Sequence, residues 1–226
     1  QAKILIGKAM KVNSSRLIRR FLQNQSIWNK IELEEIEKRI KKTHISHFTE
    51  WILVRILAKW GVKLYLSKRI RLKNILLTKN SNNKPVLKIF TKDREHLLDE
   101  LPYLSISHSK NYVFISLSSI PIGIDCELVS SRSNSWKNKV FSSQEIIRVD
   151  KHINKFKNFT LDTILTIMWS IKESTLKIIE GLTIGDIPDI KINTFSNQII
   201  TTISNYEKSY KNYFTVIDDT VLSLAL

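Results

Sequence analysis

The stretch IGIDCELV, residues 122–129, alternates apolar and polar side chains and places two carboxylates, Asp125 and Glu127, two positions apart. Side chains two apart on a β-strand share one face, about 6.5 to 7 Å from each other. The other face carries the apolar residues Ile122, Ile124, Cys126 and Leu128, which is the pattern of a half-buried strand. Two acids on one face either point into water or hold a hard divalent cation, which prefers oxygen ligands. The pair alone is compatible with both.

The composition around this strand is that of a basic globular protein. The chain has 226 residues, 42% of them hydrophobic, and 36 Lys and Arg against 21 Asp and Glu, a net charge of +15. This charge favours anionic partners such as nucleic acid, a phosphorylated small molecule or an acidic protein. The single cysteine, Cys126, excludes an internal disulfide and fits a reducing compartment. Without a long apolar run or a signal-peptide pattern at the start, we expect a cytoplasmic protein with no membrane partner.

Upstream of the strand, the periodicity predicts helices and short strands. Residues 31–42 read as a helix with Leu33, Ile36 and Ile40 on one stripe, and residues 48–60 as a second helix that ends at Gly61. Strands are expected at residues 62–66 and 73–78, a turn at 80–85, and two strands around a polar turn within 103–118.

Downstream, residues 130–139 read as a loop, and a short helix opens after Ser142 or Ser143. The longest helix is expected at residues 160–181, and the last forty residues predict two or three antiparallel strands. We therefore expect an α+β fold of two related lobes, residues 1–118 and 119–226, each a small antiparallel sheet packed with helices.

The longest helix carries a second set of charged residues. Trp169, Glu173 and Lys177 are four apart and lie along one side, with Lys172 beside them. A glutamate followed by a lysine at i+4 is also an ordinary stabilising surface pair. The helix alone does not choose between a surface pair and a site.

Five motifs in a fixed order make the choice. They are NKP (83–85), SISHS (105–109), IGIDCE (122–127), FSSQE (141–145) and WSIKESTLK (169–177). Together they resemble the Sfp-type 4′-phosphopantetheinyl transferases, whose marks are G-K-P, S-H-S, G-x-D-x-E, F-S-x-x-E and W-x-x-K-E-(S/A)-x-x-K. The resemblance covers residues 83–181, and the chain is about twice as long as the short trimeric synthases of the same superfamily.

The resemblance implies an enzyme with its active site at the interface of two pseudo-twofold lobes. Such an enzyme transfers the phosphopantetheine arm of coenzyme A to a serine of an apo acyl or peptidyl carrier protein and releases 3′,5′-ADP. It depends on Mg²⁺, with Mn²⁺ as a substitute, and serves fatty-acid, polyketide or nonribosomal-peptide synthesis. We accordingly expect coenzyme A and a carrier as partners, no nucleic acid, and a monomer.

The resemblance also implies roles for individual residues. The metal ligands are Asp125, Glu127 and Glu173, with Glu173 as general base and Lys177 as the lysine that contacts the phosphates and the leaving group. The coenzyme A contacts are Lys84, Pro85, Ser107, His108 and, at the end of the first helix, Lys38, Lys41 and Lys42.

Several positions depart from the family pattern, and two other functions stay open. Asn83 replaces the glycine of G-K-P, Lys110 follows S-H-S where glycine is usual, and Cys126 stands where Ile or Val is favoured. The alternatives are a metal-dependent nuclease, because clustered acids in a basic protein also describe a phosphodiester hydrolase, and a non-catalytic nucleic-acid-binding protein, because of the charge.

Overall fold

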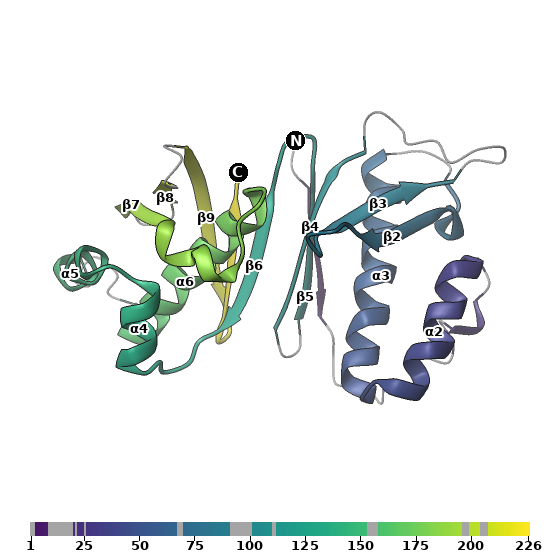
Figure 1. Ribbon diagram of the computed structural model, residues 1–226, viewed down its shortest axis with the longest axis horizontal. Coiled ribbons are helices and arrows are strands. Elements are labelled where there is room, and N and C mark those ends of the chain that lie inside the picture. The colour runs from purple at the N-terminus through teal and green to yellow at the C-terminus, as the bar shows by residue number, and fades with distance from the viewer. Residues whose placement is uncertain are drawn as a thin grey trace. The chain divides into compact units, whose positions relative to one another are not determined.

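The chain divides into two compact α+β units, which are described separately. In unit 1 are residues 1–106 and 111–120, and in unit 2 residues 107–110 and 121–226. The computed structural model describes residues 3–8, 20, 22–24, 26–66, 70–90, 101–109, 112–152, 158–195, 199–203 and 208–226 (Figure 1). Lys110 lies outside these residues. The α+β class with small antiparallel sheets is confirmed.

Unit 1 packs one long helix against two small sheets. Strands β1 (Lys3–Lys8), β5 (Tyr112–Ser118) and β4 (Tyr103–Ser109, of which residues 107–109 are grouped with unit 2) form one sheet in the order β1-β5-β4, and β2 (Ile75–Lys79) pairs with β3 (Pro85–Ile89) as a hairpin. Helices α2 (Lys30–Lys42) and α3 (Ile45–Leu66) and the 3₁₀ helix η1 (Leu72–Asn74) complete it. Ala58 and Val62 of α3 belong to a buried cluster with residues of β2, β3 and β5.

Helix α3 is longer than the sequence predicts. Its expected end at Gly61 and the strand expected at 62–66 are wrong, because the helix continues through Gly61 to Leu66. Val62 is fully buried in the core, and a glycine inside a helix costs only about 1 kcal/mol, which this packing outweighs. On the stripe expected along α2, Ile36 is buried, whereas Leu33 and Ile40 are exposed.

A fully buried ion pair joins α2 to α3 in unit 1. The ammonium of Lys59 contacts Glu32 at 2.5 Å, and both side chains are 0% exposed. Glu32 is the third residue of α2 and forms a capping box with Asn29. Lys59 also donates to the backbone oxygens of Ile27 at 2.8 Å and Leu72 at 3.2 Å.

Unit 2 is a five-stranded antiparallel sheet crossed by one long helix. The strand order is β6 (Gly123–Leu128), β10 (Thr220–Ala225), β9 (Ser209–Ile217), β8 (Ile199–Ile203), β7 (Lys191–Phe195). Helix α6 (Leu161–Ile178) packs on β6 and β10, and α4 (Asn134–Val140), α5 (Ser143–His152) and the 3₁₀ helix η3 (Ile184–Asp189) lie around it (Figure 1).

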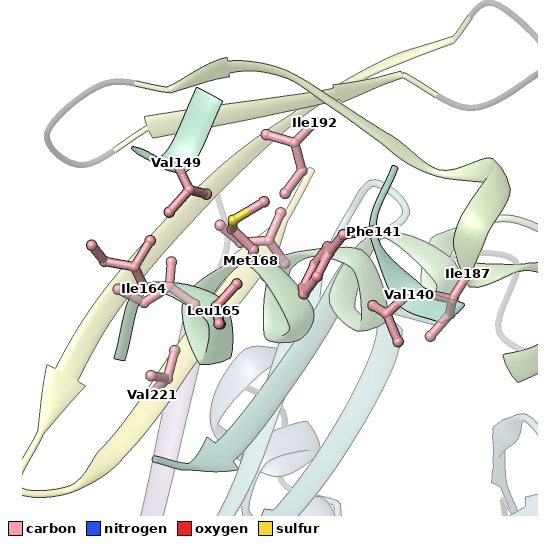
Figure 2. Close-up of a cluster of buried hydrophobic side chains, with 11 residues drawn as sticks. Val140, Phe141, Val149, Ile164, Leu165, Met168, Ile187, Ile192 and Val221 are labelled. Carbon is pink, nitrogen blue, oxygen red and sulfur yellow. The ribbon is translucent and has the colours of Figure 1, made fainter. Parts of the chain in front are cut away.

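The core of unit 2 is built on the apolar stripe of α6. The helix starts at the cap Thr160, whose hydroxyl accepts from the Thr163 N–H, close to the expected boundary. Figure 2 shows Ile164, Leu165 and Met168 among the buried side chains, together with residues of α4, α5, β7 and β10. The expected burial of this stripe is confirmed, except that Leu161 is 40% exposed.

One helix of unit 2 was expected to be a loop. Residues 134–140 form α4, which Ser133 caps by accepting a hydrogen bond from the Trp136 N–H. Val140 at its end and the following Phe141 are buried in the core. A single hydroxyl cap and two buried side chains thus make a helix from a sequence rich in Ser, Asn and Lys.

Gly123, the first residue of β6, lets α6 lie directly on the strand. A Cβ atom there would lie 1.8 Å from the backbone oxygen of Ser174 in α6. We expect Gly123→Ala to lower the free energy of unfolding by about 1 to 3 kcal/mol or more, because strand and helix must separate. Urea unfolding measures this loss. The matched control is Gly185→Ala, where the nearest atom would be 3.6 Å away; equal stability of the two variants would contradict the close packing.

Within the described ranges, no helix combines the length and the apolar character that a membrane crossing needs.

Candidate functional site

Three carboxylates from two elements of unit 2 come together beside Gly123. Asp125 and Glu127 lie on β6, Glu173 lies on α6, and one oxygen from each lies within 4.8 Å of the others. Asp125 is 2% exposed and the other two are partly buried. The two-residue spacing on β6 and the direct packing of α6 on that strand produce this cluster, which is named the acid cluster below.

Asp125 is held at the base of the acid cluster. Its Oδ1 accepts hydrogen bonds from the Ser107 hydroxyl and from the Lys177 ammonium, each at 3.0 Å. Among the described residues, none donates to the buried Oδ2 while Glu173 is ionised; a protonated Glu173 can donate to Asp125. One oxygen of this carboxylate is thus oriented, and the other is left to a proton or a cation.

Glu127 is hydrogen-bonded to two residues outside the acid cluster. Arg132 contacts its Oε2 at 3.2 Å, and the side chain of Trp169 is hydrogen-bonded to it. Burial and, next, the charge of Asp125 raise the pKa of Glu127, while Trp169 and Arg132 lower it. The indoles of Trp136 and Trp169 meet edge to face at 5.3 Å, and Arg132 lies over Trp136.

Glu173 has a strongly raised pKa. Burial and then the negative charge of Asp125 raise its pKa to about 8, Glu127 adds to the rise, and the Lys177 ammonium opposes it. Close carboxylates cannot all ionise at little cost without a cation between them. The charges of the neighbouring acids thus favour the protonated form of Glu173.

Lys177 reaches from α6 to the strand. Its ammonium donates to the Ile124 carbonyl oxygen at 2.7 Å and to Asp125, and the side chain is 30% exposed. The interpretation as an ordinary surface pair with Glu173 does not account for these contacts. A lysine in this position puts positive charge at the edge of three acids.

Of the remaining predicted residues, Ser107 and His108 belong to unit 2, and the rest belong to unit 1. Ser107 is buried, with its hydroxyl on Asp125 and accepting from the Cys126 N–H at 3.1 Å, whereas the adjacent His108 is exposed. The lysines Lys38, Lys41 and Lys42 are exposed in the last two turns of α2. Lys84 and Pro85 lie at the start of β3.

Asn83, which departs from the glycine of G-K-P, keeps the backbone conformation that a glycine would supply. Its φ is 59°, in the left-handed region that glycine favours and that asparagine tolerates better than most residues. Asn80 closes the turn, because its side chain accepts from the Asn82 and Lys84 N–H groups. The substitution therefore does not require a different turn.

The predicted motifs also contain a buried ion pair that sequence reasoning missed. Lys172, 0% exposed, contacts Glu145 at 3.1 Å and donates to the Val140 carbonyl oxygen at 2.9 Å. Glu145 also accepts from the Ile192 N–H and forms a capping box with Ser142. The F-S-x-x-E glutamate and the W-x-x-K-E lysine are thus structural partners, and their separation of 27 residues gave no local signal. Arg132 likewise lies outside every motif.

Comparisons with known proteins found similarity to a family model, a curated relative and a solved structure. Residues 121–225 match the model of the 4′-phosphopantetheinyl transferase superfamily. The 4′-phosphopantetheinyl transferase gsp of Aneurinibacillus migulanus is 28% identical over 168 residues, which are 72% of this chain and 62% of that protein. The chain thus spans less than two thirds of that relative's length. A solved structure of the holo-ACP synthase from Plasmodium yoelii covers 51% of this chain and 90% of its own, with a TM-score of 0.36 and 16% identity.

Proposed function

We propose that the protein moves the 4′-phosphopantetheine arm of coenzyme A to a serine of an apo carrier protein, because residues 121–225 match the model of the 4′-phosphopantetheinyl transferase superfamily. The leaving product is 3′,5′-ADP. The observation that carries the proposal is the acid cluster, because its three carboxylates stand at the positions of the G-x-D-x-E and W-x-x-K-E motifs and lie within 4.8 Å.

The acid cluster fits a divalent metal. It offers three oxygen ligands, the preference of Mg²⁺, and Asp125 has a buried oxygen whose only available partner among the described residues is a protonated Glu173. Asp125, Glu127 and Glu173 would hold the ion. When bound, Mg²⁺ supplies positive charge that neutralises the phosphate oxygens of the substrate during transfer.

The residues of the chain supply the proton chemistry. In its ionised form, Glu173 accepts the proton of the attacking serine hydroxyl, a step that a positioned carboxylate can perform. Lys177 carries an ammonium beside Asp125 and stabilises the charge of the leaving phosphate. Ser107 orients Asp125, while Arg132 and Trp169 orient Glu127.

We assign contacts with coenzyme A to predicted residues of each unit. His108 stands beside the buried Ser107, and we assign it to the coenzyme A phosphates. In unit 1, Lys84 and Pro85 are assigned to the nucleotide, and the basic end of α2, residues 38–42, to its 3′-phosphate.

Intact-mass analysis of an apo carrier incubated with the protein, coenzyme A and Mg²⁺ tests the proposal. We expect the carrier to gain one phosphopantetheine group on its serine and the solution to gain one 3′,5′-ADP per carrier. EDTA should stop the reaction. Acyl and peptidyl carriers are tested in parallel, because the carrier-binding surface is not assigned.

Asp125→Asn is the matched variant for this assay. The amide keeps the size of the side chain but removes a charged ligand, so we expect the transfer rate to fall by about 10²-fold or more while the circular dichroism spectrum is unchanged. Carriers that stay unmodified with every preparation, or an Asp125→Asn protein as active as the wild type across a Mg²⁺ titration, would refute the assignment. Cleavage of DNA or RNA by the wild type would instead favour the nuclease.

A further inference from the structure

Unit 1 contains an open, basic surface pocket that takes no part in the proposed transfer. Its volume is about 540 Å³, and its lining residues are Ser26, Trp60, Lys63, Arg71, Leu72 and Lys73. Pockets of about 300 to 1,000 Å³ accommodate small molecules and cofactors. None of the residues assigned to the metal or to coenzyme A lines this cavity, which is named the Trp60 cavity below.

The chemistry of the Trp60 cavity is aromatic and cationic. Trp60 is 46% exposed, which is unusual for a side chain that large, and the Lys63 ammonium lies 5.4 Å from the centre of its indole. Lys63, Arg71 and Lys73 bring three positive charges, and among the described residues that line the cavity none is acidic. Cations next to an exposed flat ring suit an anionic ligand that also has a ring.

The walls of the Trp60 cavity are fixed by the buried Lys59. Its ammonium donates to the carbonyl oxygens of Ile27 and Leu72. Ile27 follows the lining residue Ser26, so Lys59 connects the segment of Ser26 with the segment of Leu72. The next residue, Trp60, forms the third wall. A hydrogen bond of 3.2 Å from the Lys73 N–H to the Ser26 carbonyl oxygen joins the same two segments directly.

This arrangement suggests a role for the buried pair of Lys59 and Glu32 in ligand binding. Taking Lys59 and Glu32 out of water is costly, and apolar residues of similar volume are often at least as stabilising. The proposed transfer uses neither residue. Holding the walls of a binding site in place before the ligand arrives reduces the ordering cost of binding.

We propose that the Trp60 cavity binds a nucleoside diphosphate, with the base stacked on Trp60 and the phosphates on Lys63, Arg71 and Lys73. Stacking on an aromatic side chain needs a flat base, and charge-assisted hydrogen bonds need the phosphates. Both parts are therefore required for tight binding. Neither adenosine nor pyrophosphate alone satisfies the cavity.

The test follows the indole N–H signals of the full-length protein in ¹H–¹⁵N spectra, without metal or carrier. The chain has five tryptophans, and the Trp60 signal is the one missing from Trp60→Leu. We expect ADP to shift this signal with a dissociation constant at least about tenfold lower than that of adenosine or pyrophosphate. Because the readout is at Trp60, it is independent of whether the protein transfers phosphopantetheine.

A pair of double variants separates a site from a general basic surface. Lys63→Gln with Lys73→Gln should weaken ADP binding at the Trp60 signal by about tenfold or more. Lys79→Gln with Lys139→Gln removes the same amount of charge from exposed residues elsewhere. This control should change the dissociation constant of ADP by less than about twofold. The proposal is overturned if ADP leaves the Trp60 signal in place, if pyrophosphate binds as tightly as ADP, or if both double variants weaken binding equally.

Discussion

Replacing Glu173 with glutamine is expected to lower the transfer rate by about 10² to 10⁴-fold, because an amide cannot accept the proton of the attacking serine. The substitution also removes the negative charge of one of the three carboxylates that would hold the metal. Single-turnover measurements with saturating coenzyme A and Mg²⁺ separate the chemical step from binding. Glu180→Gln, an exposed change at the end of the same helical region, is the control and should transfer normally.

The same variant is expected to be more stable than the wild type at alkaline pH when no metal is present. Burial, followed by the charge of Asp125, raises the pKa of Glu173 from about 4.5 to about 8. Between these values the folded chain keeps a proton that the unfolded chain has released, so the free energy of unfolding of the wild type falls as pH rises. Glutamine does not titrate, and we expect a gain on the order of 2 to 4 kcal/mol at pH 9.

Urea unfolding in EDTA at pH 5, 7 and 9 measures this gain. The two curves of stability against pH should diverge through the neutral range, while Glu180→Gln should follow the wild type. Parallel curves for Glu173→Gln and the wild type would show that the acid cluster does not bind the extra proton. If Glu173→Gln gains stability but keeps its transfer rate, the raised pKa of Glu173 is supported and its role as general base is refuted.

Lys172→Met is the second substitution with a large expected effect. It leaves Glu145 buried without its cation, and breaking a buried pair from one side costs about 3 to 5 kcal/mol. For a chain of this size we expect the melting temperature to fall by about 6 to 20 °C. Thermal unfolding and urea unfolding both measure the loss.

A double variant tests whether the cause is the uncompensated charge. In Lys172→Met with Glu145→Gln, no charge is left buried, although the amide oxygen can accept from only one of the Ser142 and Ile192 N–H groups that the carboxylate serves. The double variant should therefore recover part of the lost stability. If it is as unstable as Lys172→Met alone, the loss comes from packing of the lysine stem and not from its charge.

The motifs predicted the neighbourhood of the site better than its internal contacts. The strand spacing predicted that Asp125 and Glu127 would share a face, and the four-residue spacing placed Glu173 and Lys177 on one side of a helix; the structure brings the three acids together. Their roles remain proposals. The Ser107 and Lys177 contacts to Asp125 arise from packing between segments distant in the chain, which periodicity does not report.

Errors in the predicted fold have the same origin. Gly61 looked like a helix end because local propensity favours that position, but Val62 continues the helix into the core. Residues 134–140 looked like a loop because Ser, Asn and Lys are poor evidence for a helix, yet the Ser133 cap and the buried Val140 stabilise one. In both cases tertiary contacts outweigh a local preference.

The pair of Lys172 and Glu145 also sets the angle of α6 about its own axis. Successive residues of an α-helix are separated by about 100° around the axis, so a slip of one position would leave an ammonium in the core without a partner. Because Lys172 is locked toward Glu145, the direction of its neighbour Glu173 toward β6 is fixed as well. The buried ion pair thus favours one rotation of α6 about its axis. The buried pair of Lys59 and Glu32 favours one rotation of α3 in the same way.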